Sequence, residues 1–164
     1  MTKSIEDLKA AFAGESQANR KYLAFAEKAE KEGFLQAARL FRAAAAAETV
    51  HAHNHLRAMD GIKSTAENLQ EAMAGEDYEA ESMYPEFIND AKLEDEKRAL
   101  RSFVYAMEVE KQHRALYKEM LENLEAQEEY EYYVCPVCGS THRRSAPETC
   151  PVCGTDGSRF MKIS

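Results

Sequence analysis

Two stretches of the sequence, Glu48-Thr49-Val50-His51 and Glu110-Lys111-Gln112-His113, share one pattern, a glutamate followed three residues later by a histidine. Three residues make nearly one turn of an α-helix, so each stretch projects a carboxylate and an imidazole from the same helix face. A single motif of this kind is weak evidence, because both residue types are ordinary on solvated helices. Its repetition on a second helix-compatible segment predicts two faces that hold metal ions between them.

Both motifs lie on the apolar stripe of their predicted helices. The helix-spaced companions are Phe41 and Ala44 for the first motif and Leu100, Phe103, Met107, Tyr117, Leu121 and Leu124 for the second. An unpaired charge on such a stripe would cost roughly a few kcal/mol or would shift the pKa of the charged group. A bound cation removes that cost, so the position favours metal ligands.

Two further glutamates, Glu15 and Glu76, also lie on apolar helix faces. Glu15 precedes Glu48 by 33 residues and Glu76 precedes Glu110 by 34, which indicates an internal repeat. In each half, one helix supplies a glutamate and the next supplies Glu-x-x-His. This is the ligand set of carboxylate-bridged di-iron or di-manganese four-helix bundles. Glu79, one turn after Glu76, falls outside the repeat and would be a seventh protein ligand.

Length and charge restrict the class of protein. A chain of 164 residues can hold one sizeable core and a small appendage. A net charge of -8 and a pI near 5.2 argue against unaided binding to nucleic acid or to an anionic membrane. The apolar runs are short, and residues 1–20 lack the apolar core of a signal peptide, so no membrane span is predicted and a cytoplasmic location is expected.

The apolar periodicity predicts four long helices. The first begins at Thr2 or Ser4 and ends before Gly33, and the others cover about 34–60, a segment through Glu76 that reaches about 90, and 91 or 93 to 127. Residues 62–75 have two interpretations, the start of the third helix or a short helix within a crossover between the halves. Pro85 predicts a kink or a local break.

Other polar residues of the helices have simpler interpretations. His53 and His55 are interpreted as surface or rim residues rather than as ligands, because a histidine pair needs further ligands to form a site. Tyr22 and Tyr84, seven and eight residues after Glu15 and Glu76, are either core residues or hydrogen-bond donors to the ligating carboxylates.

The C-terminal tail repeats a cysteine motif, as Cys135-Pro-Val-Cys138-Gly and Cys150-Pro-Val-Cys153-Gly. Two such knuckles form a tetrahedral four-thiolate site, and a module of about 35 residues needs its metal in order to fold. Zinc would make the site structural, whereas iron would make it a one-electron carrier. Composition places the domain boundary near residues 126–131. Val134 and residues 160–163 are predicted to form short, paired strands.

Together these motifs closely resemble the rubrerythrin family over essentially the whole chain, including the stretches Phe12-Ala-Gly-Glu-Ser16 and Ala74-Gly-Glu-Asp-Tyr-Glu79. The resemblance implies a mainly α fold: a ferritin-like di-iron four-helix bundle at residues 1–128, followed by a small rubredoxin-like Fe(Cys)4 metal-knuckle domain with short β-strands at 129–164. Every expected ligand position is present.

The resemblance also implies an activity, that of a non-haem di-iron peroxidase that reduces hydrogen peroxide to water in oxidative-stress defence. Electrons would enter at the rubredoxin-like iron from a rubredoxin or an NAD(P)H-dependent reductase. Glu48 and Glu110 would bridge the irons, and Glu15 and Glu76 would each bind one. His113 would bind the second iron, while the first would move between His51 when reduced and Glu79 when oxidised. Tyr22 and Tyr84 would orient the carboxylates.

The sequence also suggests a homodimer. Glu110 and Cys135 are 25 residues apart, and if the tail extends from one helix end, the four-cysteine site would lie far from the di-iron site of its own chain. A partner packed head to tail, as in the family, would bring a rubredoxin-like site closer. We therefore expect a homodimer or larger assembly with electron transfer between subunits.

Three other functions are compatible with parts of the sequence. An iron oxidation and storage protein would use nearly the same bundle ligands. A helical bundle that docks a zinc ribbon onto a partner would need its five carboxylates on apolar faces to be satisfied without metal, which is costly. Dioxygen, rather than peroxide, could be the main oxidant of the same di-iron site.

Overall fold

The computed structural model describes residues 2–126 and 128–164, which form two compact units. One unit ends at Lys63 and the other begins at Ser64. The fold is mainly α, and the strands are confined to the C-terminal region. Among the described residues, no helix combines the length and the apolar character that crossing a membrane requires.

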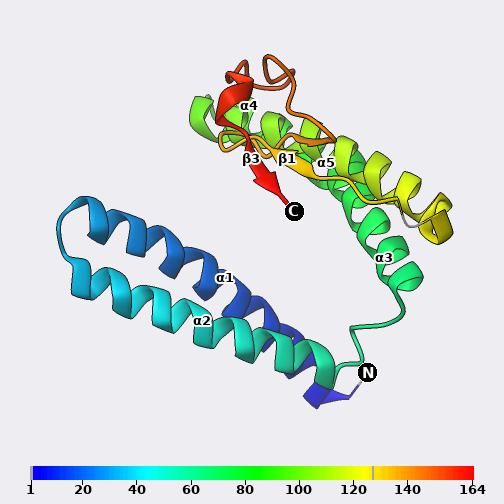
Figure 1. Ribbon diagram of the computed structural model, residues 1–164. Coiled ribbons are helices and arrows are strands. Elements are labelled where there is room, and N and C mark those ends of the chain that lie inside the picture. The colour runs from blue at the N-terminus through cyan, green and yellow to red at the C-terminus, as the bar shows by residue number, and fades with distance from the viewer. Residues whose placement is uncertain (1, 127) are drawn as a thin grey trace. The chain divides into compact units, whose positions relative to one another are not determined.

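The first unit is an antiparallel hairpin of α1 (Lys3–Lys31) and α2 (Leu35–Ala58) (Figure 1). Gly33 ends α1 as predicted: its φ of 84° suits glycine, and the next residue, Phe34, donates its N–H to the Ala29 carbonyl at 2.8 Å. The buried residues of the hairpin are small, namely Asn19, Ala26, Ala29, Ala38, Ala45 and Ala52. Small side chains let the two backbones approach closely.

The second unit pairs a long composite helical segment with a second helix. The segment consists of α3 (Thr65–Tyr78), the π-helical turn η1 (Glu79–Met83) and α4 (Tyr84–Leu93), and its partner is α5 (Lys97–Glu122). A capping box between Ser64 and Glu67 starts α3. Residues 65–75 are therefore the beginning of the third helix, and no separate crossover helix is formed.

The break predicted at Pro85 is confirmed, and it takes the form of the π turn. Proline has no N–H to donate to the carbonyl four residues before it, so a regular α-helix would lose a bond here. The wider turn absorbs this defect: Tyr84 donates its N–H to the Glu79 carbonyl, five residues back. Turns of this type inside α-helices are frequent at functional sites.

The bounds of the fourth helix differ from the prediction. Its expected start at residue 91 or 93 is wrong, because α4 continues to Leu93 and α5 begins only at Lys97, after a turn in which Asp95 has a φ of 53°. Its end comes at Glu122, where both the N–H and the side-chain amide of Asn123 donate to the Glu119 carbonyl. The short 3-10 turn η2 (Leu124–Ala126) follows, and the predicted last residue, 127, lies outside the described residues.

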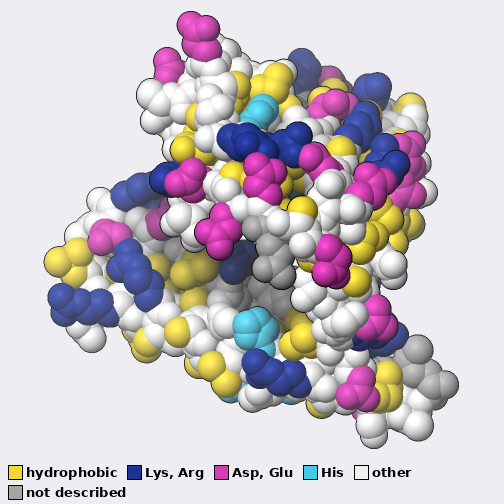
Figure 2. Space-filling model, turned by 45° about the vertical axis from the view of Figure 1, so that its right-hand side comes forward, with side chains coloured by type: hydrophobic (Ala, Val, Ile, Leu, Met, Phe, Trp, Pro, Cys, Tyr) yellow, Lys and Arg dark blue, Asp and Glu magenta, His cyan; other side chains and the backbone are white. Residues whose placement is uncertain are grey.

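Charged side chains of both signs are interspersed on the face shown in Figure 2. On α5 they form local ion pairs, such as Lys111 with Glu108 at 2.7 Å and Lys118 with Glu122 at 3.9 Å. Exposed pairs of this kind contribute little to stability, roughly 0–1 kcal/mol each. They mark the solvated side of the helix.

The C-terminal region forms a three-stranded antiparallel sheet in the order β2-β1-β3, with β1 at Tyr132–Val134, β2 at Thr141–Arg143 and β3 at Met161–Ile163. A 3-10 turn, η3 (Gly157–Arg159), precedes the last strand. The predicted strands at Val134 and near the C-terminus are confirmed, whereas β2 was not predicted. This missed strand lies against α5 and carries the contact that matters most for the site.

Candidate metal centres

The first unit brings together Glu15 of α1 with Glu48 and His51 of α2, so that one ligand atom of each lies within 4.8 Å of the others. His51 Nδ1 is 2.9 Å from Glu48 Oε2 and 4.0 Å from Glu15 Oε1. The cluster forms because antiparallel packing of the two helices places Glu15 opposite the Glu-x-x-His turn. These three residues are half of the predicted ligand set.

The second unit repeats this arrangement with Glu76 of α3 and with Glu110 and His113 of α5. His113 Nδ1 is 2.9 Å from Glu110 Oε2 and 3.5 Å from Glu76 Oε1. In both clusters, therefore, the same imidazole nitrogen faces two carboxylates. Each unit supplies one half of the six-residue set, and the joining of the halves into one di-metal centre is a proposal.

The aromatic residues beside the two clusters show how closely the halves match. The ring centroids of Tyr22 are 6.4 Å from Phe25 and 6.3 Å from Phe41, and those of Tyr84 are 6.3 Å from both Phe87 and Phe103. The phenylalanine pair is 5.6 Å apart in each half. The two tyrosines thus occupy equivalent positions in aromatic clusters.

One additional residue accounts for the difference in residue spacing between the two halves. Glu15 and Tyr22 are seven residues apart, whereas Glu76 and Tyr84 are eight apart; from tyrosine to the Glu-x-x-His motif the spacings are identical. The extra residue falls in the segment that contains the π turn, which begins at Glu79. The insertion therefore explains the repeat lengths of 33 and 34. The unpaired seventh carboxylate is a separate difference, because Ala18 stands three residues after Glu15 where Glu79 stands three after Glu76.

Burial and crowding of carboxylates alter the protonation of the second cluster. Burial, followed by a hydrogen bond and the charge of Glu110, raises the pKa of Glu76 to about 7. Burial is also the main cause that raises the pKa of Glu110, and burial followed by the charge of Glu76 raises that of Glu79. Three acids that resist ionisation in one place form a donor set that a cation would stabilise, so the residues present fit a divalent metal.

Tyr117 is a residue near this cluster that sequence analysis treated only as an apolar companion. Burial is the main cause that raises the pKa of Tyr117, followed by the charges of Glu76 and Glu110. Burial also raises the pKa of Tyr84, followed by the charges of Glu110, Glu79 and Glu76. Tyr117 lies seven residues, or about two helix turns, after Glu110, and this spacing was the sequence signal that could have placed it near the cluster. His53 and His55, predicted to be surface or rim residues, belong to neither cluster.

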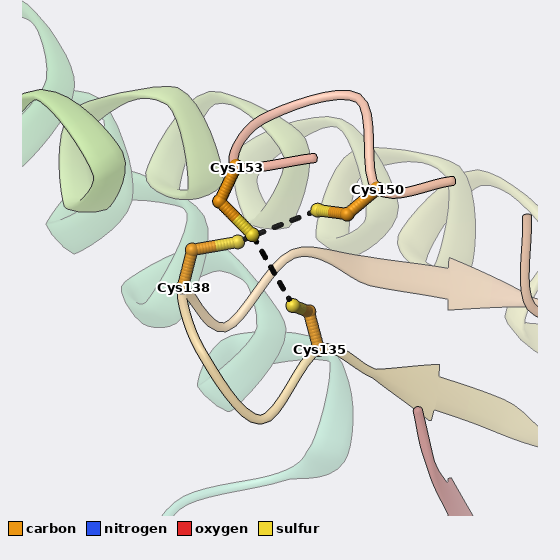
Figure 3. Close-up of side chains that lie close together, drawn as sticks. All are labelled: Cys135, Cys138, Cys150 and Cys153. Carbon is orange, nitrogen blue, oxygen red and sulfur yellow. Dashed lines mark hydrogen bonds between the residues drawn. The ribbon is translucent and has the colours of Figure 1, made fainter. Parts of the chain in front are cut away.

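The four cysteines converge as predicted, and none of them forms a disulfide (Figure 3). Cys135 Sγ is 3.6 Å from Cys153 Sγ, and Cys138 Sγ is 3.5 Å from Cys150 Sγ. Sulfurs bound tetrahedrally to one metal at about 2.3 Å would be about 3.8 Å apart, so the arrangement fits a single ion.

Glycine and backbone amides shape each knuckle. Gly139, with a φ of 85°, donates its N–H to the Cys135 carbonyl at 3.0 Å, and Gly154, with a φ of 76°, does the same to Cys150. Burial disfavours the Cys150 thiolate, but hydrogen bonds from the backbone of Cys153 and Val152 lower its pKa overall. The turn thus aims backbone amides at the sulfur of this cysteine.

The tail does not extend away from its own helix, so the condition on which the long intrachain distance depended is not met. After α5 the chain turns back, and Thr141 Oγ1 of β2 lies 3.0 Å from His113 Nε2. Gln112 Oε1 accepts hydrogen bonds from Ser140 Oγ at 3.0 Å and from the Thr141 N–H at 3.2 Å. The reversal could not be deduced from residue spacing, because the predicted distance assumed that the segment after α5 continued outward.

Comparisons with known proteins identify related families for both regions of the chain. The family model for rubrerythrin matches residues 6–121, and that for the rubrerythrin rubredoxin-like domain matches residues 133–161. Rubrerythrin-2 of Clostridium acetobutylicum is 35% identical over 94% of this chain and 93% of its own length. Nigerythrin of Nitratidesulfovibrio vulgaris is 35% identical over 90% of this chain and 80% of its own.

Solved structures share the fold as well as the sequence. A mixed-valence state of nigerythrin aligns with a TM-score of 0.60 and 34% identity, over 99% of this chain and 88% of that one. A fully reduced, all-ferrous state of nigerythrin aligns equally well, at 33% identity. The fold is therefore the ferritin-like helical class with a rubredoxin-like module, and the chain has the ligands for a di-iron centre and a four-cysteine iron site. With both of its regions matched, this chain belongs to the rubrerythrin family.

Proposed function

We propose that this chain is a non-haem di-iron peroxidase that reduces hydrogen peroxide to water. The observation that carries the proposal is that one chain combines two carboxylate–histidine clusters with a four-thiolate site, whose module is hydrogen-bonded to the histidine of one cluster. When bound, a di-iron centre supplies the two electrons that, with two protons, convert one hydrogen peroxide molecule into two water molecules. The four thiolates would hold the iron at which replacement electrons enter, one at a time.

The carboxylates divide into two proposed roles. Glu48 and Glu110, each 2.9 Å from a histidine Nδ1, would bridge the two metal positions, and Glu15 and Glu76 would each bind one position. His113 would bind the second. This assignment rests on the family resemblance and on the matching geometry of the two clusters.

His51 and Glu79 are the proposed exchanging pair. The side chain of His51 is 54% exposed, compared with 28% for His113, so it is less constrained by its surroundings. Glu79 is half-buried beside Glu76, and its raised pKa shows that its negative charge is disfavoured without a nearby cation. An imidazole is neutral and a carboxylate is negative, so replacing His51 with Glu79 compensates for added positive charge on oxidation.

Tyr22 and Tyr84 are proposed to orient ligating carboxylates. Their rings are held by equivalent phenylalanine pairs, and the charges of Glu110, Glu79 and Glu76 all affect the pKa of Tyr84. A phenol fixed in this way can donate a hydrogen bond to a carboxylate without changing the metal charge.

The electron donor and the assembly are further parts of the proposal. We propose a rubredoxin or an NAD(P)H-dependent reductase as the donor, in a reducing cytoplasm that keeps the four cysteines free of disulfides. A head-to-tail homodimer remains a prediction from the family, although the long intrachain distance no longer argues for it. Light scattering on the purified protein would test it, and a strictly monomeric, fully active chain would refute it.

The test of function is an anaerobic stopped-flow experiment. The fully reduced protein is mixed with one equivalent of hydrogen peroxide per di-metal site, and the oxo-bridged ferric and iron–thiolate absorptions are followed. Rapid oxidation of the di-iron centre, with oxidation of the four-cysteine iron on further peroxide, is expected. Failure to react with peroxide, together with slow oxidation by dioxygen and retention of iron as mineral, would instead favour a storage function.

A further inference from the structure

The two ring nitrogens of His113 face different parts of the second unit. Nδ1 points to Glu110 and Glu76, at 2.9 and 3.5 Å. Nε2 is 3.0 Å from Thr141 Oγ1, and that hydroxyl is 2.9 Å from the Gly139 carbonyl. The imidazole therefore lies between the carboxylate cluster and the cysteine module.

The chemistry of these partners fixes the direction of the hydrogen bonds. A carbonyl oxygen can only accept, so the Thr141 hydroxyl donates its proton to Gly139. Thr141 Oγ1 must then accept from His113, which places a proton on Nε2 and leaves the lone pair of the neutral ring on Nδ1. That lone pair is directed at the two carboxylates, where a bound cation would satisfy all three groups.

Other contacts hold Thr141 in place. Its N–H and the hydroxyl of Ser140, a residue that is 0% exposed, both donate to Gln112 Oε1. Gly139 is itself part of the first cysteine knuckle and bonds to Cys135. The hydrogen-bond chain thus runs from the histidine into a loop whose shape depends on the four thiolates.

His51 provides an internal contrast. It occupies the equivalent position in the repeat, and its Nδ1 also faces carboxylates, yet among residues 2–126 and 128–164 its Nε2 has no hydrogen-bond partner. The arrangement at His113 is therefore not a general feature of the Glu-x-x-His motif. It depends on the strand β2, whose Thr141 contacts His113 within the second unit.

We propose that Thr141 is a positioning residue for His113: it fixes the tautomer with the proton on Nε2 and so links the folded cysteine module to the carboxylate cluster of the same unit. This inference rests on the proposed metal site. It assigns to the module a structural role at the cluster in addition to any electron transfer.

The test uses the full chain with one equivalent of diamagnetic zinc, which the four thiolates bind, so that the carboxylate cluster is left without metal. The histidines are then followed by long-range proton–nitrogen NMR. The His113 signals are those lost in a His113→Gln variant. The wild type should show a protonated Nε2, and Thr141→Val should lose this single tautomer or the sharpness of its signals. Thr141→Ser should restore it, because serine keeps the hydroxyl. Thr149→Val is the matched control, because Thr149 lies in the same module and its side chain is exposed.

Metal affinity supplies a second measurement. Removing a hydrogen bond to a metal-bound histidine typically lowers affinity 10- to 100-fold. Competition with a chelator should show a loss of about this size at the carboxylate site for Thr141→Val, and wild-type affinity for Thr141→Ser and Thr149→Val. The four-cysteine site should keep its metal in all three variants, which shows that the module is still folded.

Two results would overturn the inference: a wild-type His113 that carries its proton on Nδ1, or a Thr141→Val variant with unchanged tautomer and affinity. The proposed function fails by a different result. A chain that shows the expected Nε2 proton and the affinity loss, but does not oxidise its reduced iron with peroxide, would refute the peroxidase and support the role of Thr141.

Discussion

At the scale of single residues, the second carboxylate cluster holds buried acidic side chains whose ionisation is unfavourable. Glu76 and Glu110 are held together by helix packing, and burial raises the pKa of both. Without a cation, such a pair is most stable when protons are shared between the two acids. The cluster is thus prepared for metal at a cost to the metal-free protein.

The stability of the metal-free protein should therefore depend on pH. The pKa of Glu76 rises from 4.5 to about 7 on folding, so its contribution to metal-free stability is full below pH 4.5 and is lost as the pH rises through 7. A Glu76→Gln variant lacks this titration. Between pH 5 and pH 8, the melting temperature of the wild type should therefore fall relative to that of the variant. Thermal unfolding in a chelator measures this; a constant difference between the two proteins would contradict it.

Removal of Glu79 should affect turnover more than stability. Glu79→Ala deletes the proposed ligand of the oxidised site while leaving His51, so peroxide turnover should fall by about 10-fold or more. The matched control is Glu81→Ala, on the same π turn, where the exposed side chain pairs with Arg114 instead. Stopped-flow oxidation by peroxide compares them, and equal rates for the two variants would remove the proposed role of Glu79.

At the scale of elements, helix ends and turns determine which side chains meet. The α1–α2 hairpin depends on the positive φ of Gly33, because that turn makes the helices antiparallel and sets Glu15 opposite Glu48. The composite third helix depends on the π turn. Gly33 positions ligands without being one, whereas the π turn also carries the proposed ligand Glu79.

Glycine substitutions separate backbone strain from packing. A Cβ at Gly33 would meet no atom within 4 Å, but the φ of 84° is unfavourable for alanine, so Gly33→Ala should destabilise by about 1 kcal/mol. Gly14, which lies inside α1 with the same open surroundings, should gain roughly 0.5–1 kcal/mol on substitution by alanine. Urea unfolding of the two variants measures the contrast; effects of the same sign would contradict this account.

Elements were predictable where a local signal was strong. The stop at Gly33 and the defect at Pro85 each have a direct cause in the sequence. The start at Ser64 was one of two interpretations of residues 62–75, and the capping box shows which of them holds. The π turn was visible only indirectly, as a repeat of 34 rather than 33 residues, because one extra residue does not reveal where it is accommodated. The three-residue strand β2 was too short for its pattern to be informative.

At the scale of the whole molecule, the cysteine module contacts α5 through residues that are far apart in the sequence. Spacing alone identified the six cluster residues and the four cysteines, since helix geometry and the knuckle motif are local. It could not identify Gln112 and Thr141, which meet only because the chain reverses after α5. Contacts of this kind depend on the path of the backbone, for which the sequence around residues 123–131 contains no strong signal.

Metal removal should destabilise the cysteine module more than the α1–α2 hairpin. A module of about 35 residues cannot bury enough apolar surface to fold alone, so chelation of its metal should remove amide-exchange protection from β1, β2 and β3. The hairpin of α1 and α2, which packs through its alanines, should retain more of its protection. Hydrogen exchange before and after chelation is the measurement, and strands that remain protected would show that the module folds without metal.

The single additional residue in the second half has a consequence for symmetry. Two identical hairpins would be related by a two-fold axis, and any ligand gained by one would appear in the other. One extra residue between Glu76 and Tyr84 ends that equivalence, while the spacing from each tyrosine to its Glu-x-x-His motif stays the same. In a chain built as an internal repeat, one such residue makes the backbone beside the two clusters different, so the two proposed metal positions would not be interchangeable.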